Sequence, residues 1–179
     1  GRLTRGGLHE TGSDCSMIML ANILLDSQQQ PLVEPLVREL PDFLQETAFL
    51  DRIRALIPGW KIRKLSGECF AKSIGLKSDF FGDALIALRD DLEHDQRCER
   101  RIQLTGGKIY KRNEDSVRSI ASGLLKILFP HGDLSDSEFE HYCVSPAVKL
   151  RQLIWDQLQV LDSEYRQYES NIGYKILSD

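Results

Sequence analysis

A short apolar run near the start of the chain is the feature that most limits its fold. The run CSMIMLA occupies residues 15–21 and is bounded by polar, turn-forming residues. This pattern predicts a strand that is buried on both faces, as in a parallel sheet. A single strand cannot form a sheet, so we expect its partners to lie outside this chain. The sequence thus suggests a fragment of a larger protein, with a hairpin or loop over the Gly-rich residues 1–14.

The remainder of the chain has mainly helical patterns. Residues 28–43 contain three prolines and predict a loop with short helical turns, while residues 49–57 fit a strand or a short helix. Beyond Trp60 the apolar spacing has a helical period. The elements expected there are helices over 66–74, 79–97 (capped by Ser78), 113–128 and 135–168, a hairpin over 103–110, and a terminal strand over 172–177.

Composition narrows the class of protein. Hydrophobic residues make up 41% and charged residues 28% of the 179, which is typical of a globular domain. The net charge of −4 argues against a free-standing nucleic-acid-binding module, but it leaves room for a local basic patch. We find neither an apolar run long enough to span a membrane nor a signal peptide. The four cysteines are widely scattered, which favours a reducing, cytoplasmic location.

Taken one by one, the residues that could carry chemistry give weak signals. The pairs His94/Cys98 and His141/Cys143 lack the second close-spaced pair that a structural zinc site needs, so we expect no metal site. The sequence contains no Gly-x-x-x-x-Gly-Lys-Ser/Thr phosphate loop. We therefore expect this chain alone to be unable to bind and cleave a nucleotide.

The order of several segments along the chain is more specific. FLDRIRALIPGW (49–60), GLKSDFF (75–81) and SIASGLLKILFP (119–130) resemble the BrxL family of Lon-related AAA+ ATPases in BREX phage-defence systems. The resemblance runs in order over about residues 1–174. It implies a mixed α/β, mainly α fold, in which the C-terminal part of an AAA+ core, with its sensor-1 strand, precedes a helical lid. The expected division is residues 1–60 for the core part, 61–170 for the lid and 171–179 for a following segment.

The resemblance also implies roles for single residues in ATP hydrolysis. Asn22 matches sensor 1, whose amide orients the attacking water, and Arg52 matches the arginine finger, which stabilises charge at a neighbouring subunit's nucleotide. Arg112 is our choice for sensor 2, with Arg118 as the alternative, although the family favours Arg-Asp where this chain has Arg-Asn. The competing interpretations are a loop cap for Asn22, a surface pair with Asp51 or Glu46 for Arg52, and a solvated helix start for Arg112.

The first residues and the whole-protein function follow from the same resemblance. Arg2 and Arg5 precede sensor 1, where related motors carry a pore hairpin that contacts DNA phosphates; an ordinary solvated turn is the alternative. The expected parent is a homo-oligomeric ring that uses ATP, with Mg²⁺ bound outside this chain, and acts on DNA without a membrane. The alternatives are the ATPase part of an ATP-dependent Lon-type protease, and a non-enzymatic helical interaction domain.

Overall fold

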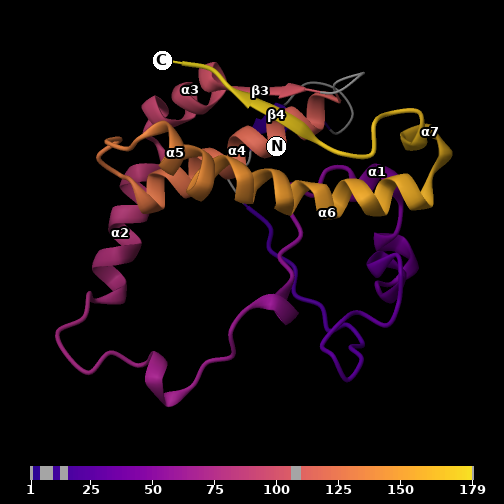
Figure 1. Ribbon diagram of the computed structural model, residues 1–179, viewed down its shortest axis with the longest axis horizontal. Coiled ribbons are helices and arrows are strands. Elements are labelled where there is room, and N and C mark those ends of the chain that lie inside the picture. The colour runs from indigo at the N-terminus through magenta and orange to yellow at the C-terminus, as the bar shows by residue number, and fades with distance from the viewer. Residues whose placement is uncertain (1, 5–9, 13–15, 106–109, 179) are drawn as a thin grey trace.

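The structure is a computed structural model that describes residues 2–4, 10–12, 16–105 and 110–178. The fold is mixed α/β and mainly helical, as predicted. In Figure 1 the long helices and one small sheet gather on one side, and the segment between α1 and α2 loops away from them. None of the helices in these ranges is both long and apolar enough to cross a membrane.

Helix α4 (Lys111–Leu128) is the centre of the larger hydrophobic core. It begins two residues before Asn113, close to the predicted start. Val117, Ala121 and Leu125 follow each other at helical spacing and are fully buried. They pack against α3 (Leu92–Arg101) and against a long C-terminal helix, which consists of α5 (Asp136–Glu138), the π-helical η5 (Phe139–Val144) and α6 (Ser145–Leu161).

The start of this C-terminal helix agrees with the sequence. The Ser135 hydroxyl accepts a bond from the Glu138 amide, and the Glu138 carboxylate accepts a bond from the Ser135 amide at 2.8 Å. This reciprocal pair is a capping box, which satisfies amides that the first helical turn leaves free. The hydrogen bonds from Ser135 lower the pKa of Glu138. The predicted helical region from Ser135 to Tyr168 is completed by α7 (Ser163–Arg166).

A second, smaller core joins the beginning of the chain to α6. Val37 and Leu50 pack with Ile154, Trp155 and Leu158. The Trp155 ring also packs with tyrosines at centroid distances of 5.4–5.9 Å: Tyr110, Tyr165 and Tyr168. Residues on both sides of the predicted boundary at residue 60 therefore share one core, and the boundary itself stays a prediction.

The segment that supplies Val37 and Leu50 is a loop with short helical turns, which agrees with the prediction for residues 28–43 and extends beyond it. Its elements are η1 (Leu36–Glu39), η2 (Asp42–Leu44), α1 (Thr47–Leu50), η3 (Gly59–Lys61) and η4 (Gly67–Cys69). Only η4 forms within the helix predicted over residues 66–74.

Two small antiparallel sheets complete the fold. Strand β1 (Arg2–Thr4) pairs with β2 (Glu10–Gly12), which confirms the hairpin at the start of the chain. Strand β3 (Ile102–Thr105) pairs with β4 (Gly173–Ile176). The terminal strand is thus confirmed. The turn of the hairpin predicted over 103–110 lies at 106–109, outside the described residues, so that hairpin stays a prediction; the partner that the structure describes for β3 is β4. The partner comes from the far end of the chain because β4 packs apolar side chains against the larger core.

Residues 16–22 have no regular secondary structure, where the sequence predicts a buried strand. The side chains of Met17, Ile18 and Leu20 are 72%, 88% and 96% exposed. A strand needs hydrogen bonds from a neighbour, and no strand pairs with these residues in the part of the chain that the structure describes. Cys15 lies outside the described residues.

The long helix predicted over residues 79–97 is divided into α2 (Ser78–Arg89) and α3. The division falls at Asp91, whose carboxylate accepts a bond from the Glu93 amide at 2.9 Å and caps α3. This bond lowers the pKa of Asp91. Ser78 is the first residue of α2 rather than its cap, and α2 buries none of its residues.

Candidate functional site

A buried carboxylate lies directly beside the predicted arginine finger. Asp51 follows α1 and is 1% exposed. Its Oδ2 accepts bonds from the Tyr110 hydroxyl at 2.8 Å and from Nη1 of Arg112, and its Oδ1 accepts from Nη2 of Arg151 at 3.0 Å. Charge-assisted bonds of this kind are the strongest in proteins. We refer to Asp51, Tyr110, Arg112, Asn113 and Arg151 as the Asp51 network.

Arg151 connects the middle of α6 to the backbone on both sides of Arg52. Its side chain is fully buried. Nη1 donates to the carbonyl of Ile53 at 2.6 Å and to that of Asp51 at 3.3 Å, and Nε donates to Oδ1 of Asn113 at 2.8 Å. Burial lowers the pKa of Arg151, and the Asp51 charge opposes this shift.

The two residues from the start of α4 differ in their exposure. Burial, followed by the bond to Asp51, raises the pKa of Tyr110. The Arg112 side chain is 45% exposed and pairs with Asp51, which raises its pKa. Two guanidinium groups thus share one carboxylate. Asn113, where the family resemblance favours Asp, supplies a neutral acceptor to Arg151 instead of a second negative charge.

The guanidinium of Arg52 does not pair with the neighbouring carboxylates of Asp51 and Glu46. Its side chain is exposed, and Nη1 donates to the carbonyl of Ala48 in the preceding turn. Among the described residues Arg52 forms no ion pair, so the surface pair with Asp51 or Glu46 does not form. Asp51 is occupied by the network instead. The assignment of Arg52 as an arginine finger stays a prediction. Its guanidinium is exposed, and the backbone on both sides of it is held by Arg151.

Arg118, the alternative for sensor 2, is engaged within the fold. It donates to the carbonyl of Ile102 from Nε at 3.2 Å and from Nη2 at 2.9 Å, and it pairs with Glu114 at 2.7 Å. These bonds hold the start of β3 against α4. Because Arg112 is more exposed, it remains the stronger candidate of the two.

The structure does not bring the other predicted site residues into the Asp51 network. Asn22 is exposed, and its side chain makes no hydrogen bond within the described ranges. Arg2 lies in β1, where the backbone alone is described, and Arg5 lies outside the described residues. Their roles at sensor 1 and in DNA binding stay predictions.

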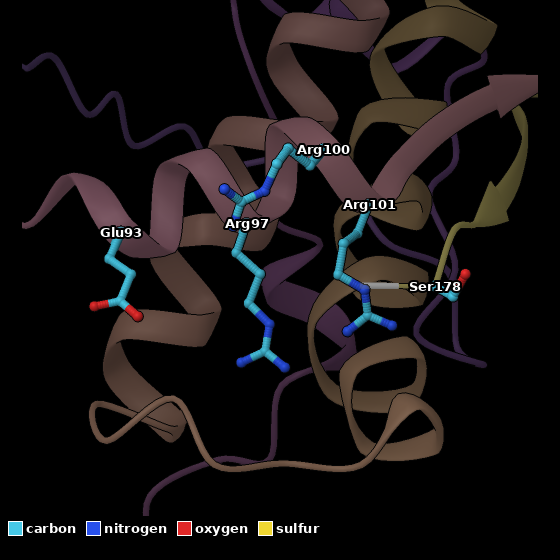
Figure 2. Close-up of a pocket in the computed structure, with 5 residues that line it drawn as sticks. All are labelled: Glu93, Arg97, Arg100, Arg101 and Ser178. Carbon is cyan, nitrogen blue, oxygen red and sulfur yellow. The ribbon is translucent and has the colours of Figure 1, made fainter.

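A pocket of about 410 Å³ lies along α3 and is lined by Glu93, Arg97, Arg100, Arg101 and Ser178 (Figure 2). Arg97 donates to the carbonyl of Gly132, in the loop after α4. Arg101 donates to the carbonyl of Leu177 at 3.0 Å and to Asp136 at 2.6 Å. Both side chains extend from the same side of α3 (Figure 2). These arginines therefore hold the loop after α4 and the end of the C-terminal strand against α3, and their role is to stabilise the fold.

Two of the residues considered for a metal, His94 and Cys98, have structural roles. The ring nitrogens of His94 lie 2.8 Å from Oδ2 of Asp91 and 3.3 Å from the carbonyl of Phe129, while Cys98 is fully buried in the larger core. Burial raises the pKa of Cys98 to about 12. In the described part of the chain, no group of three or more His, Cys, Asp or Glu side chains could hold a metal ion.

Comparison with known proteins identifies the family of this sequence. Residues 1–171 match the family model described as "Lon-like protease BrxL-like, ATPase domain". The chain is 30% identical over 146 residues to the Lon-like protease BrxL of Escherichia coli O9:H4 (strain HS), covering 82% of this chain and 21% of that protein. It is 26% identical over 169 residues to the Lon-like protease BrxL of Bacillus cereus (strain H3081.97), covering 94% and 24%.

The chain therefore belongs to the BrxL-like ATPase domain family, as its sequence segments suggest. It spans about a fifth to a quarter of the length of the two curated relatives. The sequence suggested roles for Arg52 and Arg112, which stay predictions, and it did not indicate the contacts of Asp51 with Tyr110 and Arg151.

Proposed function

We propose that this chain is the nucleotide-sensing portion, from sensor 1 to the lid, of a ring-forming ATPase that acts on DNA in BREX phage defence. The family match supports ATPase membership. The observation that carries the residue-level proposal is the Asp51 network, which fixes the backbone around Arg52 and leaves the Arg52 side chain exposed. A finger must reach out of its own subunit, so exposure on a rigid support suits the role.

The hydrogen-bond donors of the Arg112 guanidinium fit a nucleoside triphosphate as substrate. The Arg112 guanidinium already binds the oxygen of a carboxylate, and the same planar donor group binds phosphate oxygens. We propose that Arg112 contacts the nucleotide of its own subunit and that Asn22 orients water there. Any Mg²⁺ would be held by residues outside the described ranges.

The experiment that tests this proposal is Arg52→Ala in a protein of the full length of the relatives. We expect loss of ATP hydrolysis with nucleotide binding largely retained, because the finger serves the neighbouring subunit. Arg63→Ala, which removes an exposed arginine from a surface pair with Glu68, is the matched control and should hydrolyse ATP normally. Normal turnover by an intact Arg52→Ala oligomer would refute the assignment.

The DNA part of the proposal rests on Arg2 and Arg5, in or next to the hairpin of β1 and β2. Each phosphate contact releases counterions, so replacing both residues by Ala should weaken DNA binding and reduce its salt dependence. A salt titration of DNA binding measures both effects. Identical slopes for the variant and the parent would exclude these residues from the DNA interface.

A second candidate is the ATPase part of an ATP-dependent Lon-type protease, since both relatives carry the name Lon-like protease. It predicts ATP-dependent cleavage of an unfolded protein substrate by the full-length protein, which gel electrophoresis would detect. Hydrolysis of ATP with the substrate left intact would favour the DNA motor.

A further inference from the structure

We propose that Asp51 is the positioning residue for Arg52, and that Arg112 exchanges between Asp51 and the nucleotide. This inference rests on the proposed function. It implies that the state of a subunit's own nucleotide is transmitted, through Asp51, to the finger that the same subunit presents to its neighbour. Neither the family match nor the relatives' names assign a role to Asp51, Tyr110 or Arg151.

The positioning part follows from the bonds on either side of Arg52. Arg151 binds the carboxylate and the carbonyl of Asp51, and also the carbonyl of Ile53. The residues before and after Arg52 are therefore held by one buried guanidinium. Arg52 has no other side-chain bond to residues outside its own turn among the described residues. The Asp51 network thus holds the backbone on both sides of Arg52, in addition to the bond from the Arg52 amide to the Phe49 carbonyl at 3.0 Å.

The exchange part follows from the difference between the two arginines that share Asp51. The Arg151 side chain is 0% exposed, whereas that of Arg112 is 45% exposed and can turn toward solvent or a ligand. If Arg112 leaves, Oδ1 of Asp51 keeps Arg151 and Oδ2 keeps the Tyr110 hydroxyl. The buried carboxylate then still has two donors, one of which is the cationic guanidinium of Arg151, so it is not left unpaired. Leaving a buried charge unpaired would be costly.

Charge supplies a reason for coupling between the two states. While Arg112 is bound to Asp51, two guanidinium groups share the carboxylate. Each of them weakens the attraction between the carboxylate and the other. When Arg112 binds a phosphate, Arg151 is the one cation that remains paired with Asp51. This stronger ion pair holds residues 51–53 more firmly. Because Arg112 and Tyr110 open α4 and Arg151 lies on α6, movement of either helix reaches Arg52 through Asp51.

The test uses the full-length oligomer and two variants with opposite expected effects on binding of a non-hydrolysable ATP analogue. Asp51→Asn removes the charge that competes for Arg112, so the analogue should bind about threefold to tenfold more tightly. The rate constant kcat should fall about tenfold or more, because Arg52 loses its support. A general loss of structure would instead weaken binding and catalysis together.

Tyr110→Phe is the second variant and keeps the ring packing with Trp155. Without the hydroxyl, the departure of Arg112 leaves Oδ2 of Asp51 without a donor, so the analogue should bind several-fold more weakly. The opposite signs of the two variants are the signature of the exchange. Unchanged affinity in Tyr110→Phe would overturn the exchange, whether or not Asp51→Asn can be purified.

Subunit mixing tests positioning separately. Asn22→Ala subunits keep Asp51 and the finger Arg52, and Asp51→Asn subunits keep Asn22 and Arg112 at their own nucleotide site. A 1:1 mixture should recover about a quarter of the parental rate if interfaces act independently, because one pairing in four combines a good site with a good finger. The Arg52→Ala/Asn22→Ala mixture is the reference and should recover equally. Recovery in the reference alone overturns the role of Asp51 and leaves the proposed function standing. Absence of recovery in both refutes the arginine finger itself.

Discussion

Replacing Arg151 by Met tests how much the Asp51 network contributes to stability. Met has a similar length but no charge and no donors, and Arg151 is fully buried. The change leaves the carbonyl of Ile53 and Oδ1 of Asn113 without their donors at 2.6 and 2.8 Å. Each orphaned buried acceptor costs about 1–3 kcal/mol. Loss of one partner from a buried ion pair costs about 3–5 kcal/mol.

These contributions overlap, and Arg112 still pairs with Asp51 in the variant. We therefore expect the free energy of unfolding to fall by about 3–5 kcal/mol in total. For a chain of this size the midpoint of thermal unfolding should fall by roughly 10 °C. Urea unfolding followed by circular dichroism measures the free energy, and Arg63→Met, in an exposed ion pair, is the control that should change it by less than about 0.5 kcal/mol.

A double-mutant cycle sharpens the prediction. Asp51→Asn together with Arg151→Met should cost about 1–3 kcal/mol less than the sum of the two single changes, because each single change already removes the ion pair between these two side chains. Additive costs, or an Arg151→Met variant within about 1 kcal/mol of the parent, would show that the network does not stabilise the fold.

Two further predictions concern glycines and thiols. A Cβ at residue 173 would lie 2.7 Å from Oγ1 and 3.1 Å from the carbonyl oxygen of Thr105, so Gly173→Ala should destabilise the β3–β4 pair by about 1–3 kcal/mol. A Cβ on Gly123 within α4 would meet nothing within 4 Å, so Gly123→Ala should stabilise by about 0.5–1 kcal/mol; thermal melts that shift in the same direction would refute this contrast. The pKa of the exposed Cys69 thiol is lowered by a hydrogen bond from the Ser66 backbone, whereas burial raises that of Cys98 to about 12. Iodoacetamide at mildly alkaline pH should therefore label Cys69 before Cys98, and peptide mass spectrometry showing equal labelling of these two thiols in the folded protein would contradict the burial of Cys98.

Local signals were sufficient where the sequence carries a complete helix pattern. The apolar stripe that includes Val117, Ala121 and Leu125 predicted α4, and the apolar spacing after Ser135 predicted the C-terminal helix, because periodicity acts within a few residues. The division at Asp91 was missed although an Asp before a helical pattern is a cap signal. The partner of β3 could not be predicted, since strand pairing over a long sequence separation leaves no mark in the adjacent residues.

The candidate site was predictable for the exposed groups but not for the buried ones. Family resemblance pointed to Arg52 and Arg112, whereas Asp51 was expected at most on the surface. Arg151 had a visible signal: it lies three residues after Val148 and four before Trp155, on the buried stripe of α6. An arginine at such a position requires a buried acceptor. Finding that acceptor, Asp51, which lies 100 residues earlier, required the three-dimensional structure.

The π-helical segment η5 makes one part of the chain unusually tolerant of length change. Each residue added to an α-helix turns everything beyond it by about 100°. The wide turn at Phe139–Val144 absorbs one extra residue while keeping the buried stripe on either side in phase. A homologue one residue shorter here could form a plain α-helix without rotating Arg151 away from Asp51. A one-residue gap in this segment of an alignment would thus be compatible with an unchanged position of Arg151 beside Asp51.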